Sequence, residues 1–164
     1  MPHQFRAQSI HPNNAARAYP LIQVMRSDVS LEGWLAFVAA TNADSAPTPN
    51  ITAPKWPSRG VLAIENARGY IHGLFSYHVA FAIDHEAVLE VSNFVAVDSA
   101  DRAAGIKALI ASMEELAHAL GCTAIHTHVP GNWPQGKFPE AALSRHLRHA
   151  GHHLKSMNLY KPLR

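Results

Sequence analysis

The sequence has little of several features that would indicate particular classes of protein. It has one cysteine, Cys122, so no disulfide can form within the chain. The formal net charge is only +2 and no Lys or Arg run follows the pattern of a phosphate-backbone binder, so nothing indicates a nucleic-acid partner. No apolar run approaches a membrane span, and residues 1–10 lack the apolar core of a signal peptide. We therefore expect a cytoplasmic protein that binds neither nucleic acid nor membrane.

What is present is an ordinary globular composition. Of the 164 residues, 48% are hydrophobic and 16% are charged, which is typical of a folded chain rather than a disordered or fibrous one. This length is sufficient for one hydrophobic core, and no repeat or composition change marks a boundary. We expect a single domain over residues 1–164.

The N-terminal third predicts one strand and two helices. Residues 4–10 form a strand candidate, and apolar residues at helical spacing predict helices over 15–25 and 30–40. Residues 41–59 contain four prolines and many polar residues, which predicts a long loop.

The middle of the chain is rich in β-branched and aromatic residues. Residues 59–64 and 70–79 are separated by a tight-turn composition and predict a hairpin, with a third strand over 87–97. No helix fits between these strands, so they should be antiparallel.

The C-terminal part predicts a crossover. A helix over residues 100–120 ends at Gly121 and leads to a strand over 123–129, which should lie parallel to the strand over 87–97. A last helix is predicted over 141–150, and the tail over 153–163 alternates enough for a final strand or strand pair. The fold class is therefore α/β, a mixed and mainly antiparallel sheet with one parallel β-α-β crossover.

The junction between the strand over 87–97 and the following helix has an unusual composition. Gly105 lies in the first turn of the helix, where unpaired N–H groups and the helix dipole favour phosphate oxygens. Ala103 and Ala104 are small as well, and Arg102 supplies a fork of donors that suits phosphate. The alternative is that these residues simply start a helix poorly.

This junction resembles the acyl-CoA-binding segment of the GNAT superfamily of N-acetyltransferases. That family carries Arg or Gln, two variable residues, Gly, one variable residue, then Gly or Ala, and the order of elements here matches it over essentially the whole chain. The sequence departs from the pattern at Lys107, which stands where the last small residue is expected. The resemblance implies a GNAT-like fold with helices on both faces of the sheet.

The resemblance also implies a cofactor site. Acetyl-CoA is the expected acyl donor, and the strand before the motif is expected to be bulged and to splay from the next parallel strand, with free backbone groups for the pantetheine arm. The implied coenzyme A contacts are Phe94, Val95, Ala96, Val97, Arg102, Ala103, Ala104, Gly105, Ile106, Lys107 and Asn132. The acceptor is expected to be a primary amine on a small molecule or peptide, and a homodimer is left open.

Three residues are catalytic candidates by the same resemblance. Glu90 is the carboxylate on the relevant strand and a candidate base, and Asn93 is placed to hold a water. The alternative for Glu90 is a solvent-facing strand residue. The family's usual tyrosine acid corresponds to Leu147, with His146 beside it as the candidate replacement. Leu147 and Lys107 also support an alternative function, a GNAT-fold protein that binds acyl-CoA or a protein partner without turnover.

Twelve histidines raise the question of a metal site. His126 and His128 share one face of a strand, and His146 and His149 have a helical spacing that can chelate zinc. With one cysteine and no HExxH helix, we expect no metal.

Overall fold

A five-stranded sheet forms the centre of the computed structural model, which describes residues 5–43, 56–96, 102–129, 140–155 and 161–163. The strand order is β1-β2-β3-β4-β5. The strands are β1 (Arg6–Ile10), β2 (Arg59–Glu65), β3 (Ile71–Ala82), β4 (His85–Ala96) and β5 (Ala124–Thr127). Neighbouring strands from β1 to β4 are antiparallel, whereas β4 and β5 are parallel. The predicted mixed α/β architecture is confirmed.

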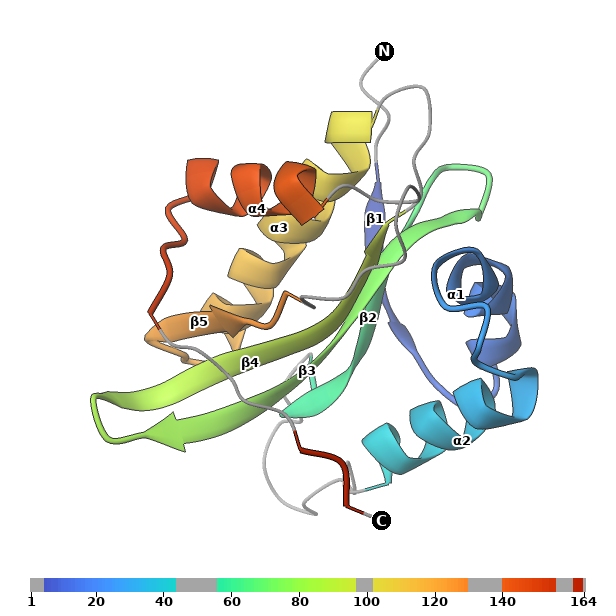
Figure 1. Cartoon of the computed structure of the whole chain (residues 1–164), viewed down its shortest axis with the longest axis horizontal. Coiled ribbons are helices and arrows are strands. Elements are labelled where there is room, and N and C mark those ends of the chain that lie inside the picture. Colours follow the sequence, from blue (N-terminus) through green and yellow to red (C-terminus); the bar gives the residue numbers. More distant parts are fainter. Residues whose placement is uncertain (1–4, 44–55, 97–101, 130–139, 156–160, 164) are drawn as a thin grey trace.

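Helices cover both faces of this sheet (Figure 1). The first group is a 3-10 turn η1 (Ala15–Ala18), α1 (Tyr19–Met25) and α2 (Leu31–Asn42). The second group is α3 (Arg102–Ala119), which connects β4 to β5, and α4 (Glu140–His149), which packs on α3. No helix in the described part of the chain is long and apolar enough to cross a membrane.

The two sheet faces can be assigned from side-chain contacts. The Thr127 hydroxyl donates to Met113 Sδ of α3 at 3.7 Å, so alternate residues of β5 and their β4 partners face α3. On that face Phe75 and Phe94 stack with ring centroids 6.2 Å apart. Leu109 and Met113 of α3 are also fully buried. On the opposite side Trp34 of α2 is buried and its indole N–H donates to the carbonyl of Ala15.

Two sequence expectations for the helices and strands differ from the structure in detail, and a third concerns the C-terminal tail. The predicted helix over 15–25 starts as a 3-10 turn because Pro20 has no N–H to continue an α-helical ladder. The predicted break between the second and third central strands is a tight turn at Ile83 and Asp84, so β3 and β4 form one long hairpin.

The final strand predicted over 153–163 is absent from the described parts of that segment, 153–155 and 161–163. The chain leaves α4 through Gly151, which has a φ of +91°. Lys155 then forms an ion pair with Asp84 at the β3–β4 turn. Residues 153–155 are therefore held near the β3–β4 turn by a side-chain contact and are not part of a strand.

Candidate active site

A fork between β4 and β5 is the main feature of the candidate site. The two strands pair only through residues 88–91 and 124–127, and the last backbone bond runs from His128 N–H to the Val91 carbonyl at 2.8 Å. β4 then continues to Ala96, whereas β5 ends at Thr127. Among the described residues, the β4 backbone over 92–96 therefore has no partner on the β5 side. The fork opens toward the end of the sheet where α3 begins (Figure 1).

A bulge in β4 lies inside this fork. Ser92 pairs with Ser76 and Val95 pairs with Leu74, so two β4 residues stand opposite Phe75 alone. Asn93 has a φ of +52°, a left-handed conformation that asparagine tolerates better than most residues. The bulge and the divergence of the strands are the geometry that the GNAT resemblance implies.

Ser76 holds the bulge in place. Asn93 Nδ2 donates to Ser76 Oγ at 2.9 Å, and Ser76 Oγ donates to the Ser92 carbonyl at 3.2 Å. Ser76 is buried, whereas Asn93 is exposed, so this small network links the sheet interior to its surface. This role could not be predicted from the sequence, because serine in a strand is compatible with many environments.

Gly105 in the first turn of α3 is buried, yet the space beside its Cα is open among the described residues. A Cβ built on Gly105 has no heavy atom of the described protein within 4 Å. At Gly73 in β3, by contrast, a Cβ would overlap the Leu109 side chain and lie 2.9 Å from the Val95 carbonyl oxygen. Packing against the described residues therefore requires glycine at Gly73 but does not require it at Gly105.

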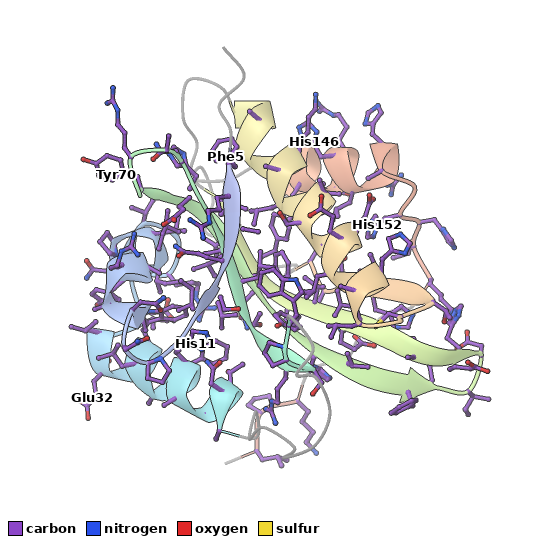
Figure 2. The ribbon with its side chains drawn as sticks, turned by 180° about the vertical axis from the view of Figure 1, so that it is seen from behind. Phe5, His11, Glu32, Tyr70, His146 and His152 are labelled. Carbon is purple, nitrogen blue, oxygen red and sulfur yellow. The ribbon has the colours of Figure 1, made fainter. Side chains whose placement is uncertain are left out.

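Cationic side chains gather where α4 packs on α3. Burial, followed by the charges of Lys107, His149 and Arg145, lowers the pKa of His146. A shallow cavity of about 450 Å³ is lined by Ser144, Arg145, Arg148 and His149. His146 and His152 both belong to the layer formed by α3 and α4 (Figure 2). Anions are favoured in this region because several cations face it together.

Glu90 lies on the opposite face of the sheet, between His126 of β5 and His128, which directly follows β5. His126 Nδ1 is 2.8 Å from Glu90 Oε1, and His128 Nε2 is 2.6 Å from Glu90 Oε2. Burial alone would raise the pKa of Glu90, but hydrogen bonds from His128 and His126 outweigh it and hold the pKa below its ordinary value. The carboxylate is therefore ionised at neutral pH and is a weak base.

No group of three or more His, Cys, Asp or Glu side chains in the described regions is arranged to hold a metal ion. The Glu90 cluster is consistent with this, because its histidines direct ring nitrogens at the carboxylate rather than at a shared point. On α4, His149 Nδ1 lies 2.8 Å from the Arg145 carbonyl and so makes a contact within its own helix.

No protein-family model matches the sequence, and no curated protein matches it by sequence comparison. Solved structures match nearly the whole chain. An acetyltransferase from Trypanosoma brucei aligns with a TM-score of 0.66 and 16% identity, over 98% of this chain and 100% of that one. An aminoglycoside N-acetyltransferase bound to a bisubstrate analogue, CoA-S-monomethyl-acetylneamine, aligns with a TM-score of 0.71 and 11% identity, over 98% and 99%.

A third similar structure is the glucosamine-6-phosphate N-acetyltransferase from Arabidopsis thaliana. It aligns with a TM-score of 0.66 and 12% identity, over 98% of this chain and 99% of that one. These alignments span nearly the whole of each chain, so the mixed sheet with its parallel β4–β5 pair matches the fold of these proteins. The chain has the GNAT fold.

The described residues among the predicted coenzyme A contacts lie in two places of the GNAT fold, the end of β4 and the start of α3. Phe94, Val95 and Ala96 lie on β4 beyond the fork with buried side chains, so only their backbone is available to a ligand there. Ala104, Gly105, Ile106 and Lys107 lie in the first turns of α3, and Lys107 is exposed. Arg102 and Ala103 belong to the same helix, and their side chains lie outside the described part of the structure, as do Val97 and Asn132 altogether.

The three catalytic candidates do not form one cluster. Glu90 and Asn93 both belong to β4, but Glu90 contacts His126 and His128 whereas Asn93 contacts Ser76. His146 belongs to α4, in the layer on the other side of the sheet (Figure 2). Sequence reasoning noted that His126 and His128 share a face but not that this face carries Glu90. The signal that could have predicted this contact is the alternation of these histidines in a strand that runs parallel to the strand of Glu90.

Proposed function

We propose that this chain transfers an acetyl or related acyl group from coenzyme A to the primary amine of a small molecule. The observation that carries the proposal is the bulged β4 strand that runs past the end of β5 toward the start of α3. By the resemblance to GNAT proteins, we infer that an acyl-CoA thioester would lie at this position. At 11–16% identity the solved neighbours establish the fold alone, so the activity itself is the inference.

The β4–β5 fork fits an extended pantetheine arm. Pantetheine carries two amide groups, each with one N–H and one C=O, and the β4 backbone over residues 92–96 offers the complementary groups on its β5 side. The ligand would add to β4 in the manner of a short strand. A backbone N–H at the bulge near Asn93 would then donate to the thioester carbonyl as negative charge develops on its oxygen.

The start of α3 fits the pyrophosphate of coenzyme A. The open space at Gly105 lets phosphate oxygens approach the N–H groups of the first helical turn, where the helix dipole is favourable. Lys107 is exposed on the next turn and faces the basic side of α4, so its charge adds to the attraction rather than being neutralised within the described protein. We therefore propose that Lys107 assists binding of the cofactor.

The polar face of β3, β4 and β5 is the proposed acceptor side. Ser76, Glu90 and Ser92 face away from α3, as do His126 and His128. An ammonium group is well matched to a face that carries the ionised Glu90. Two of the similar structures are named for small amine-bearing sugars, which supports a small-molecule acceptor here.

Two measurements test this proposal. Calorimetric titration with acetyl-CoA should show saturable binding with one site per chain. Release of free thiol should then be followed with a panel of aminosugars, polyamines and amino-terminal peptides. Binding together with amine-dependent thiol release supports the transferase, and binding without release for any amine supports the alternative of an acyl-CoA-binding protein. Absence of binding would contradict both.

A further inference from the structure

One face of α4 carries four side chains that line a common cavity. Ser144, Arg145, Arg148 and His149 surround the shallow cavity of about 450 Å³, a volume within the range of sites that hold small ligands. Ser144 and Arg148 are one helical turn apart, as are Arg145 and His149, so their side chains are neighbours on the helix surface. Two guanidinium groups and an imidazole therefore border the same space, which suits an anion.

Lys107 of α3 extends this charge toward the start of its own helix. Burial lowers the pKa of His146 first, and the charges of Lys107, His149 and Arg145 lower it further, so these three side chains lie near one ring. Lys107 is exposed and follows Gly105 by two residues. Because α4 packs on α3, the two helices combine into one basic cluster, Lys107, Arg145, Arg148 and His149.

No carboxylate neutralises the basic cluster within the described part of the chain. The side chains of Lys107, Arg145 and Arg148 form no ion pair or hydrogen bond with a described residue. Like charges three or four residues apart destabilise a helix. The helix dipole favours Arg148 and His149 in the last turn, but Arg145 precedes that turn. The stability of α4 alone therefore does not explain the cluster.

The basic cluster lies on the cofactor side of the sheet. It joins α4 to α3, whose first turn is the proposed site of the pyrophosphate. The proposed acceptor face, with Glu90, is on the opposite side of the sheet, whereas His146 belongs to the layer of α3 and α4 (Figure 2). An anion bound at the cluster is therefore a part of the cofactor rather than of the acceptor.

The chemistry of coenzyme A supplies such an anion. Its ribose carries the pyrophosphate on C5′ and a phosphate monoester on C3′, so a protein that binds the first group has the second close by. A phosphate monoester has a charge of about −1.5 to −2 at pH 7. Guanidinium groups bind its oxygens through paired, charge-assisted hydrogen bonds.

We propose that the basic cluster binds the 3′-phosphate of coenzyme A, with Arg145 and Arg148 as the main donors, and thereby selects the coenzyme over its 3′-dephospho form. This inference rests on the proposed function, because it requires the pyrophosphate at the start of α3. The 3′-phosphate takes no part in the bonds that change during acyl transfer. The cluster therefore acts on affinity and on KM for the acyl donor, and kcat stays the same.

Calorimetric titrations with acetyl-CoA and with acetyl-3′-dephospho-CoA test this inference. The wild type should bind acetyl-CoA about tenfold more tightly, the scale of one hydrogen bond to a charged group. Arg145→Gln and Arg148→Gln should each weaken acetyl-CoA binding and leave the dephospho ligand within about twofold of its wild-type affinity. Both side chains are exposed, so the variants should fold normally, and thermal unfolding checks this.

Arg68→Gln is the matched control, because it removes the same charge from an exposed residue of the β2–β3 turn. Tyr70, which directly follows Gly69 of this turn, and His146 lie on opposite sides of the molecule in Figure 2. Arg68→Gln should leave both affinities unchanged. A loss equal to that of the α4 variants would show that net charge, and not the cluster, is responsible, and would overturn the proposal.

A competition experiment on the wild type needs no variant. Adenosine 3′,5′-bisphosphate should displace acetyl-CoA at a concentration about tenfold lower than adenosine 5′-monophosphate does. Equal displacement, equal affinity for the two acyl donors, or arginine variants that weaken both donors alike would overturn the assignment of the 3′-phosphate while leaving the transferase intact. A wild-type protein that binds no acetyl-CoA would instead overturn the proposed function, and this inference with it.

Discussion

The two faces of β3, β4 and β5 differ in chemistry although they share the same backbone. On the side of α3, Phe75, Leu89, Val91 and Phe94 are fully buried. On the other side the same strands present Ser76, Glu90 and Ser92, and β5 adds His126 and His128. The first face is apolar throughout this region, whereas the second combines buried apolar residues, Leu74, Val88 and Val95, with charges and donors in fixed positions. Rigid placement of the polar groups depends on the apolar face beneath them.

The largest difference between the faces should appear in stability. Phe94→Ala removes a buried ring that stacks on Phe75, and we expect a loss of about 3–5 kcal/mol in the free energy of unfolding. His78→Ala on the other face removes an exposed side chain and should change that free energy by less than about 0.5 kcal/mol. Chemical denaturation of both variants measures this. Equal losses would contradict the assignment of the faces.

Two glycines on the α3 side provide a matched pair. In Gly73→Ala the new methyl group meets Leu109 and the Val95 carbonyl, so we expect a loss of about 1–3 kcal/mol in stability. In Gly105→Ala the methyl group meets no described atom, and the helix should gain up to about 1 kcal/mol because alanine is the better helix former.

Acetyl-CoA affinity should change in the opposite direction to stability in Gly105→Ala. A methyl group at that position would occupy space proposed for the pyrophosphate, so acetyl-CoA affinity in Gly105→Ala should fall about tenfold, the equivalent of about 1.4 kcal/mol. Calorimetry on the folded variant measures the change, with thermal unfolding as the check on stability. A more stable variant with wild-type affinity would remove the pyrophosphate from this turn.

The contribution of the β4 bulge to stability and to acetyl-CoA binding can be tested at Asn93. Asn93→Ala loses the bond to Ser76 Oγ and places alanine at a φ of +52°, so we expect a stability loss of about 1–2 kcal/mol and weaker acetyl-CoA binding. Asn93→Gly tolerates the backbone conformation and should recover part of both losses. If glycine and alanine behave alike, the left-handed conformation is not what matters at this position.

The smallest effect concerns the pH dependence of stability. Because the pKa of Glu90 is lower in the folded protein than in the unfolded chain, its ionised form stabilises the fold above the unfolded value, and this contribution is lost as pH falls through the folded value. Glu90→Gln should cost about 0.5–1.5 kcal/mol near neutral pH. The difference from wild type should shrink below about pH 4, the range where free glutamate takes up its proton. A constant difference down to pH 3 would contradict this account.

Sequence patterns were sufficient for the apolar face and the order of elements. The periodicities of the strands over 59–97 and of the helix over 102–119 depend on burial, which leaves a regular trace in the sequence. The polar face leaves no such trace, because Ser76, His126 and His128 acquire their roles only through cross-strand register. The tail was wrongly predicted as a strand over its described parts because alternation alone does not show whether a sheet edge is available, and Lys155 instead pairs with Asp84.

Hydrogen exchange along β4 tests the central claim most directly, because it compares the paired and unpaired parts of one strand. Saturating coenzyme A should slow amide exchange in residues 92–96 and in the first turn of α3, while residues 88–91, already paired with β5, change little. Unchanged exchange in residues 92–96 despite saturable binding would place the cofactor elsewhere and contradict the account.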